Sequence, residues 1–296
     1  MKKFLLQISA FIILLLVVCF IGKKLFPDKP GYNGAFVEKL KILQQHKDVR
    51  KIVLLGGSGT GWGISAKMIE DSLGIPTLNL GHHAGYGLLD FQKFVIEQLT
   101  KDDIIIFCPE WEFYENPEFH DKALLNDLIT KNTEYGTLLN NTLYQIRSYI
   151  PFPAIKVATF LPKEQNTPYR FDCFNANGDI VSQCSMLPKG PVSFGFRDST
   201  FSLSNFENHF PFLQTTKTFI VFPPTQARVF AKNKTFFLNI ERALAEKKYT
   251  VLDSVTDNVY PETSFFDLQY HLTCEVRAER TAHLIPKIRA LIQPGR

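Results

Sequence analysis

The amino-acid sequence predicts an α/β fold: a three-layer parallel sheet with helices on both faces, an irregular insertion and an N-terminal transmembrane helix. Short β-rich apolar runs alternate with helical patterns along much of the chain, which is typical of parallel sheets. The run Asp103–Cys108 is apolar almost throughout, as expected for a strand buried on both faces. The uncharged stretch Phe4–Gly22 predicts the transmembrane helix.

Residues 1–30 are expected to form a membrane anchor and a short linker. As a helix, Phe4–Gly22 would span about 28 Å, close to the hydrocarbon thickness of a bilayer. A cleaved signal peptide is the alternative, but the residues that follow Val17 are not the small ones that a cleavage site needs. We therefore expect a single-pass membrane protein whose main domain lies outside the cytoplasm.

Residues 31–296 are expected to form one α/β domain with an insertion around residues 115–215. Pro, Phe, Ser and Asn replace the regular pattern between residues 150 and 215, which predicts a cap over the domain. The expected strands are Lys51–Leu55, Thr77–Leu80, Asp103–Cys108, Lys217–Phe222 and Tyr249–Leu252. The expected helices are Phe36–His46, Ile64–Leu73, Leu88–Leu99, residues 122–149, Gln226–Lys247 and Thr273–Ile292.

Composition and charge exclude two classes of protein. Hydrophobic residues make up 45% of the chain and charged residues 21%, so the chain has enough apolar material for a core and is not globally disordered. The net charge of +4 is small, and no concentrated basic stripe accompanies it. We therefore expect no nucleic-acid partner.

Two cysteines flank a turn signal inside the expected insertion. Asn177-Gly178 is a strong hairpin signal, and Cys173 and Cys184 stand on either side of it. The hairpin predicts that their Cα atoms lie within about 7 Å, the reach of a disulfide. Two unpaired thiols are the alternative.

Three predicted strand ends carry the chemistry, because ligands in open α/β sheets bind beyond the carboxyl ends of the strands. Ser58 follows the first strand in a glycine-rich turn, which exposes its hydroxyl and aims its backbone N–H at a developing oxyanion. Asn79 and the later Gly81 and Gly85 follow the second strand. Near the C-terminus, an aspartate precedes a histidine just before the last helix, as needed to orient a general base.

This constellation resembles the SGNH (GDSL-like) hydrolase superfamily, and more narrowly its membrane-anchored members that modify envelope polymers. The resemblance covers roughly residues 50–112 and 217–292. It implies a flavodoxin-like fold and a catalytic triad of Ser58, His271 and Asp267. It also implies an oxyanion hole formed by the backbone N–H of Ser58 with that of Gly85 or Gly81.

The chain departs from the family pattern in two places. The usual Asp-x-x-His motif is one residue longer here, as Asp267-x-x-x-His271. The Gly-x-Asn-Asp block that should follow the third strand reads Pro109-Glu110-Trp111-Glu112, without the asparagine that donates to the oxyanion. Glu110 is either the start of a helix or a substrate contact, and the sequence leaves both open.

Other interpretations of the same residues remain. Ser58 is also a plausible turn or helix-capping serine. The stretch Gly57–Gly61 suggests a nucleotide loop, but Trp62 stands where a P-loop needs lysine. Gly61-x-Gly63-x-x-Ala66 fits a dinucleotide fingerprint loosely, without the acid that would hold a ribose. His82-His83 suggests metal ligands, and Asp253 is an alternative partner for the histidine base.

The expected function is that of an exported, membrane-anchored serine esterase or O-acyltransferase acting on an acylated envelope glycan or polymer. No cofactor and no metal are expected. The alternative is a catalytically inactive protein of the same fold that binds a glycan or a membrane acyltransferase. A nucleotide-binding α/β protein is a third hypothesis. The acyl group, and whether water or a sugar hydroxyl receives it, are not encoded in these motifs.

Overall fold

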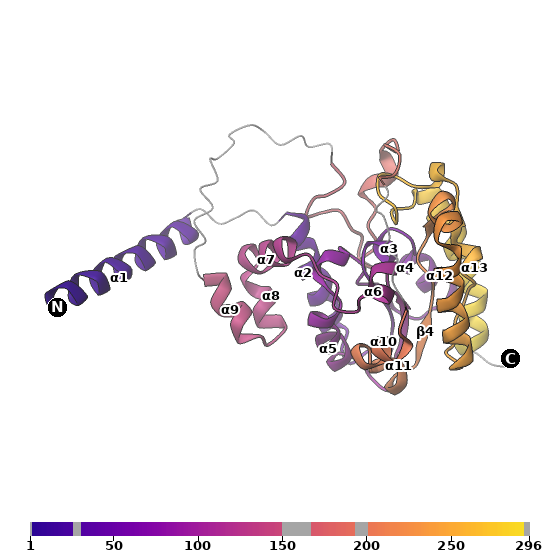
Figure 1. Cartoon of the computed structure of the whole chain (residues 1–296), viewed down its shortest axis with the longest axis horizontal. Coiled ribbons are helices and arrows are strands. Elements are labelled where there is room, and N and C mark those ends of the chain that lie inside the picture. The colour runs from indigo at the N-terminus through magenta and orange to yellow at the C-terminus, as the bar shows by residue number, and fades with distance from the viewer. Residues whose placement is uncertain (1, 26–30, 150–166, 193–200, 293–296) are drawn as a thin grey trace.

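The computed structural model describes residues 2–25, 31–149, 167–192 and 201–292. Its centre is a four-stranded parallel sheet in the order β2-β1-β3-β4. Figure 1 shows the helices around this sheet, with α1 extending away from it. The strands are β1 (Ile52–Gly56), β2 (Thr77–Asn79), β3 (Ile104–Cys108) and β4 (Thr218–Ile220). A single parallel bridge from Ile220 to Val251 occupies the place of the fifth expected strand. Because β2 and β3 flank β1, the chain reverses its direction of winding at β1, where such sheets bind ligands.

Alternation along each strand divides the core into two layers. Val53 and Leu55 of β1 belong to one buried cluster, and Ile52 and Leu54 belong to the other. The second cluster is completed by α4 (Ala66–Leu73) and α13 (Cys274–Ile292), which pack against each other. The first cluster, which contains Val53 and Leu55, is covered by helices α2, α5, α6, α7, α10, α11 and α12. The sheet is therefore buried on both faces, as its nearly continuous apolar strands require.

The other elements follow these layers in chain order. The remaining helices are α1 (Lys2–Leu25), α2 (Tyr32–Gln45), α3 (Ser58–Gly61), α5 (Leu89–Glu97), α6 (Trp111–Glu115), α7 (Lys122–Lys131), α8 (Thr133–Leu138), α9 (Thr142–Tyr149), α10 (Leu203–His209), α11 (Phe212–Thr215) and α12 (Ala227–Glu246). Short 3-10 turns lie at Ala84–Tyr86, Ser182–Ser185, Thr256–Asn258 and Glu262–Ser264. Two short strands, β5 (Thr225–Gln226) and β6 (Val259–Tyr260), pair in parallel outside the main sheet.

The predicted membrane anchor is wrong. No helix in the described ranges is both long enough and apolar enough to cross a membrane. Although α1 forms where the anchor was expected, Gln7 and Ser9 interrupt its apolar run. The part without polar residues, Ala10–Gly22, is about 20 Å long at helical rise, shorter than a bilayer core of about 30 Å. The expected localisation, a single-pass membrane protein with its main domain outside the cytoplasm, rested on this anchor and is therefore not supported.

The last helix is fastened to the sheet by a buried arginine. Arg280 of α13 donates from Nη2 to the carbonyl of Phe222 at 2.6 Å and from Nη1 to the carbonyl of Gly63 at 3.0 Å. Its Nε donates to Asn258 Oδ1 at 2.8 Å. These contacts join α13 to the segments that follow β4 and α3, and they hold the loop before α13 over the carboxyl edge of the sheet.

Within the expected insertion at about residues 115–215, the segment 167–192, called the insertion below, is irregular and docks on the sheet through a tight turn. Phe174 and Ile180 form an antiparallel bridge around Gly178, whose φ is +82°. A Cβ on Gly178 would lie 2.3 Å from the carbonyl oxygen of Asn79, so the close approach also requires glycine. Asn79 N–H in turn donates to the carbonyl of Asn177 at 2.7 Å.

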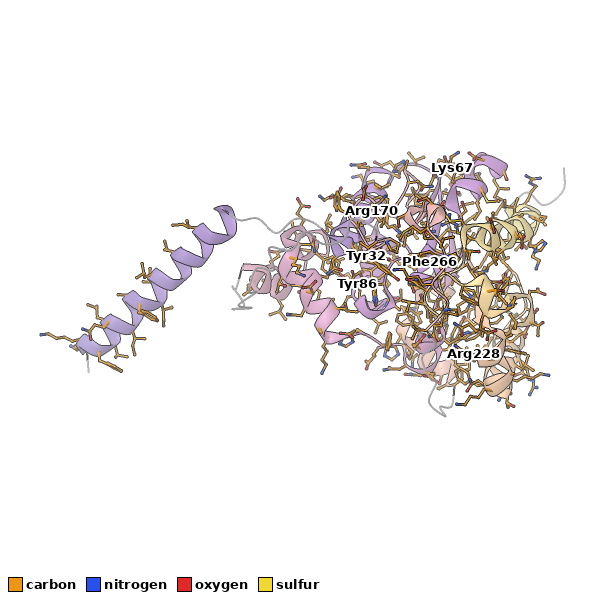
Figure 2. All side chains as sticks on the ribbon, turned by 90° about the horizontal axis from the view of Figure 1, so that it is seen from above. Tyr32, Lys67, Tyr86, Arg170, Arg228 and Phe266 are labelled. Atoms are coloured by element: carbon orange, nitrogen blue, oxygen red, sulfur yellow. A yellow bond between two sulfur atoms is a disulfide. The ribbon has the colours of Figure 1, made fainter. Side chains whose placement is uncertain are left out.

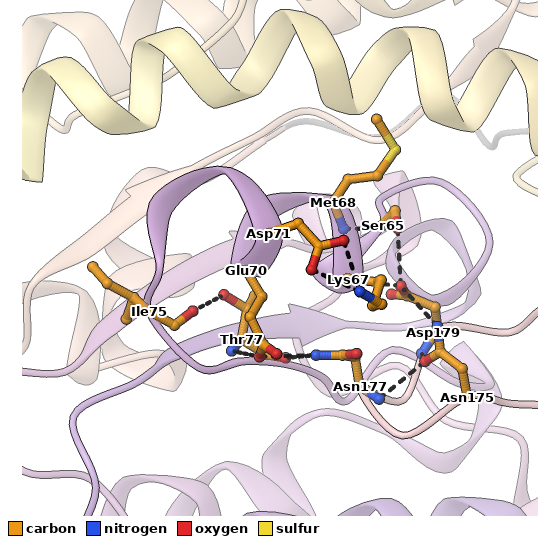
Figure 3. Close-up of polar contacts among 10 residues, drawn as sticks. All are labelled: Ser65, Lys67, Met68, Glu70, Asp71, Ile75, Thr77, Asn175, Asn177 and Asp179. Atoms are coloured by element: carbon orange, nitrogen blue, oxygen red, sulfur yellow. Dashed lines mark hydrogen bonds and ion pairs between the residues drawn. The ribbon is translucent and has the colours of Figure 1, made fainter.

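The same turn caps a helix of the sheet domain. Asp179 is fully buried and accepts hydrogen bonds from the N–H groups of Ala66 and Lys67 at 2.7 and 3.0 Å. It also accepts from the hydroxyl of Ser65 at 2.9 Å, at the start of α4 (Figure 3). Asn177 meanwhile donates to Glu70 at 2.9 Å. A carboxylate at a helix N-terminus stabilises the unpaired N–H groups there, so the insertion is anchored to α4.

Cys173 and Cys184, which the sequence placed within bridging reach, do not form a disulfide with each other. Cys184 pairs with Cys274, with Cα atoms 5.4 Å apart, and Cys173 is a buried free thiol. The hairpin exists, but the 3-10 turn Ser182–Ser185 carries Cys184 away from it toward the start of α13. The carbonyl of Cys173 accepts the N–H of Val181 at 2.8 Å, which keeps that residue inside the hairpin.

Candidate functional site

Ser58 lies directly beyond the carboxyl end of β1, in a turn that a buried carboxylate holds. Glu110 accepts the N–H of Gly57 at 3.0 Å and that of Gly59 at 2.7 Å. A Cβ on Gly57 would lie 2.4 Å from the Glu110 oxygens, so only glycine permits this approach. Ser58 itself is partly exposed, and within the described part of the chain its hydroxyl makes no hydrogen bond. The turn therefore presents the serine as the sequence predicts.

His271, which is buried, and Asp267, which is half-buried, form a pair in the loop before α13. The imidazole Nδ1 lies 2.8 Å from Asp267 Oδ1, and the side chain of His271 is only 3% exposed. A small hairpin accommodates the extra residue of the motif, because Phe266 N–H donates to the carbonyl of His271 at 2.6 Å and Phe265 bridges to Leu272. The Asp267-x-x-x-His271 spacing, one residue longer than the Asp-x-x-His motif, is thus compatible with a direct contact between the two side chains.

Trp62 fixes the plane of the imidazole. Its ring stacks on His271 with centroids 4.1 Å apart and an angle of 5° between the planes. Phe266, which is labelled in Figure 2, stacks on Trp62 in turn at 5.8 Å. Trp62 belongs to the segment that follows Ser58, so this stack brings the histidine loop against the serine turn. It also explains why tryptophan occupies the place of a P-loop lysine.

The electrostatics of the pair suit a neutral base. Burial lowers the pKa of His271, and Asp267 opposes this effect only in part. Burial by itself would raise the pKa of Asp267, but the hydrogen bond and charge of His271 bring it below its ordinary value. Near neutral pH the imidazole is therefore uncharged and Asp267 is ionised, the protonation states that a serine–histidine mechanism needs.

Tyr169, from the insertion, is a member of the site that the sequence did not reveal. Its hydroxyl lies 2.5 Å from Asp267 Oδ2 and 3.3 Å from His271 Nδ1. The aspartate thus uses one oxygen for the histidine and the other for the tyrosine. No sequence motif predicts the contact between Tyr169 and Asp267, because the two residues are 98 positions apart and Tyr169 lies in an irregular segment.

The glycines that the resemblance implied as oxyanion donors are already engaged. Gly81 N–H donates to Asn79 Oδ1 at 3.0 Å, and Gly85 N–H donates to His83 Nδ1 at 3.0 Å. Asn79 is fully buried and its amide donates to the carbonyl of Ile64 at 3.0 Å, so it holds the backbone in place. Of the implied donors, the N–H of Ser58 has no partner among the described residues.

His83 offers a donor that the sequence analysis did not assign. Because its Nδ1 accepts the Gly85 N–H, the proton of the neutral ring must lie on Nε2. Burial and the charge of His271 lower the pKa of His83 to about 4, so the ring is neutral at physiological pH. Gly81 places this segment near Ser58, because a Cβ there would lie 2.8 Å from the carbonyl of Gly57.

His82 and His83 do not form a metal site together. His82 is buried, stacks on Tyr32 with centroids 3.9 Å apart and contacts the Tyr32 carbonyl through Nε2 at 2.8 Å. Its ring therefore serves the packing of α2. Across the described ranges, no group of three or more His, Cys, Asp or Glu residues is placed to hold a metal ion.

Neither Glu110 nor Asp253, the two other acidic candidates, is positioned as a substrate contact. Glu110 is fully buried under the serine turn, and burial raises its pKa to about 8, against the opposing effect of the Gly59 N–H. Asp253 accepts the N–H of Phe222 at 3.0 Å and the amide of Asn258 at 2.6 Å, so it stabilises the end of β4 and does not orient His271. Glu110 thus supports the Ser58 turn from its buried side, through the N–H groups of Gly57 and Gly59.

A comparison of the chain with protein-family models, with curated proteins and with solved structures finds no match in any of the three.

Proposed function

We propose that this chain is a serine ester hydrolase or O-acyltransferase of the SGNH type, with Ser58 as nucleophile, His271 as general base and Asp267 as its partner. The observation that carries the proposal is the Asp267–His271 contact of 2.8 Å, in which the buried His271 ring stacks on Trp62 beside the serine turn. Hydrogen bonding from Nδ1 to a carboxylate leaves Nε2 unprotonated in the neutral ring, and Nε2 is then ready to accept a proton.

The proposed reaction proceeds through an acyl-enzyme. His271 Nε2 accepts the proton of Ser58 as the oxygen attacks the ester carbonyl, and the resulting oxyanion receives hydrogen bonds from Ser58 N–H and His83 Nε2–H. His271 then gives the proton to the departing alkoxide oxygen. Water or a sugar hydroxyl repeats the sequence, donating its proton to His271 and releasing the acid or the new ester. An acylated glycan or polymer remains the proposed substrate class.

The same geometry also favours one alternative. Within the described residues the hydroxyl of Ser58 does not hydrogen-bond to His271, and the asparagine of the family block is absent. A catalytically inactive protein of this fold, which binds an acylated glycan without cleaving it, would have these features. In that case the Asp267–His271 contact would serve binding or stability alone.

The experiment compares the full chain with Ser58→Ala. A fluorophosphonate probe is expected to label the wild type, and p-nitrophenyl acetate hydrolysis should fall by at least a thousandfold in the variant. Ser72→Ala, at an exposed serine of α4, is the matched control and should keep both labelling and hydrolysis. Labelling that persists in Ser58→Ala would contradict the nucleophile assignment, and a wild type that neither reacts nor hydrolyses would support the binding alternative.

A further inference from the structure

We infer that Tyr169 is a positioning residue of the site: its hydroxyl fixes Asp267 and thereby sets the orientation and basicity of His271. The inference deepens the proposed function and rests on it for its catalytic meaning. It also assigns a role to the insertion, which supplies this tyrosine and becomes part of the catalytic apparatus rather than a passive cover.

The first support is the division of the Asp267 carboxylate. Oδ1 faces His271 Nδ1 at 2.8 Å, and Oδ2 accepts the hydroxyl of Tyr169 at 2.5 Å. A carboxylate held at both oxygens cannot rotate about its Cβ–Cγ bond without breaking one of the two contacts. Hydrogen bonds to an ionised group are among the strong ones in proteins, so the phenol also withdraws negative charge from the oxygen that faces the histidine.

The second support is the way in which the insertion is fastened around this loop. Ser182 donates to the carbonyl of Pro168 at 2.7 Å, next to Tyr169. Further along, Val192 N–H donates to the carbonyl of Asp267 at 3.0 Å, and Lys189 N–H donates to that of Phe266 at 2.7 Å. The insertion thus holds the backbone of the Asp267 loop on one side and its carboxylate on the other.

The third support is covalent. The disulfide between Cys184 and Cys274 joins the insertion to the residue three positions after His271. Arg277 donates to the carbonyl of Ile180 and lies with Nη2 at 3.6 Å from both bridged sulfurs. Because these fastenings converge on the segment from Phe266 to Arg277, the position of Tyr169 relative to Asp267 is determined by the fold and not by one flexible side chain.

The expected pH effect has a definite sign. The groups that face His271 are the carboxylate of Asp267, the phenol of Tyr169 and the neutral imidazole of His83, while Trp62 covers one ring face without charge. Removing the phenolic hydroxyl leaves the Asp267 charge more concentrated on Oδ1, which stabilises the imidazolium. The pKa of His271 should therefore rise, and the acid limb of the activity profile should move to higher pH.

The test uses the full chain and Tyr169→Phe, with Tyr249→Phe as matched control because Tyr249 also donates to a carboxylate, Glu207, at 2.6 Å. In Tyr169→Phe we expect kcat to fall about tenfold with KM nearly unchanged, because the hydroxyl points at Asp267 and not at substrate. The acid limb of kcat/KM should move up by roughly half a pH unit or more. Tyr249→Phe should leave both quantities at the wild-type values.

A second readout does not depend on turnover. Titration of the His271 ring by NMR should give a higher pKa in Tyr169→Phe than in the wild type, and no further difference when Tyr169→Phe is added to Asp267→Asn. An unchanged His271 titration in Tyr169→Phe would overturn the inference even if hydrolysis is normal. If hydrolysis is absent from the wild type, the proposed function fails, and the NMR titration still decides the role of Tyr169.

Discussion

Glu110 shows how one buried side chain can serve a site without touching a substrate. It lies at the start of α6, as one of the two sequence interpretations had it, but its carboxyl group reaches across to the serine turn after β1. The next acid, Glu112, accepts the hydroxyl of Tyr270 at 2.7 Å and the amide of Gln269 at 2.9 Å. The segment after β3 therefore supports both the serine turn and the histidine loop.

The pKa of Glu110 predicts a specific pH dependence of stability. Burial raises it from 4.5 to about 8, so between these values the folded state holds a proton that the unfolded chain has lost. The contribution of Glu110 is then fully present below about pH 4.5 and decreases as the pH rises through about 8. Glu110→Gln removes this titration, so its free energy of unfolding should vary less with pH over that interval.

Urea unfolding of the wild type and Glu110→Gln at pH 5, 6.5 and 8 measures the difference between the two slopes. Glu97→Gln, at an exposed glutamate of α5, is the control and should follow the wild-type slope. Parallel slopes for the wild type and Glu110→Gln would contradict the assignment of a titrating, buried Glu110. The amide variant is also expected to lose one of the two turn contacts, which lowers its stability at every pH.

The regular strands and helices were predictable from the sequence, and the contacts between irregular segments were not. Most of the expected strands and helices overlap the observed ones to within a few residues, because period and apolarity are local properties. The exceptions are the expected strand Tyr249–Leu252, which forms only one bridge, and the expected helix at residues 122–149, which is divided into α7, α8 and α9. The serine turn after β1 and the Asp267–His271 contact were predictable for the same reason, since each is encoded within a few consecutive residues. Tyr169 and the buried role of Glu110 depend on contacts between distant segments, which no local pattern reports.

The partner of Cys184 was not predictable for a similar reason. The turn at Asn177-Gly178 was recognised, but the direction in which the chain leaves it is set by the short turn Ser182–Ser185 and by Arg277. Those contacts come from α13, almost one hundred residues later, with a separation of 90 between the bridged cysteines. Sequence proximity was therefore a poor guide to which thiol Cys184 would meet.

The observed disulfide predicts a large effect on stability at the scale of elements. Because it closes a loop of 90 residues, the double variant Cys184→Ala, Cys274→Ala should lose about 4.5 kcal/mol of unfolding free energy. Reduction of the wild type should produce a similar loss, whereas the double variant should not respond to reductant. Chemical denaturation with and without dithiothreitol measures both. Equal stability of the wild type and the double variant would show that the contacts of Asp179 and Arg277 suffice to hold the insertion.

On the scale of the whole molecule, the carboxyl ends and the amino ends of the strands have different roles. The carboxyl edge holds the serine turn and the histidine loop. At the opposite edge, Lys51 and Asp103 form an ion pair of 2.6 Å in which both side chains are fully buried. Asp103 also accepts the N–H of Lys51 at 2.8 Å and that of Thr100 at 2.7 Å, so it ties the starts of β1 and β3 together.

Breaking this pair should therefore affect stability and leave activity intact. Lys51→Met leaves the buried carboxylate of Asp103 without a charged partner, and is expected to lower the free energy of unfolding by about 3 kcal/mol. Lys67→Met, which breaks an exposed pair with Asp71, should change it little. Hydrolysis per folded molecule should equal that of the wild type in both variants. A loss of specific activity in Lys51→Met would show that the two edges are coupled.

The order of the site residues along the chain has a consequence for biosynthesis. Ser58 is translated early, Tyr169 in the middle, and His271 with Cys274 more than 200 residues after the serine. At about 5 to 20 residues per second, the ribosome needs roughly 10 to 40 s to pass from the nucleophile to its base. During that interval β1, β2 and β3 have already been made, but the serine has no histidine beside it. Under the proposed mechanism, Ser58 of a nascent chain has no general base, and its hydroxyl becomes reactive only after α13 and the Cys184–Cys274 disulfide have formed.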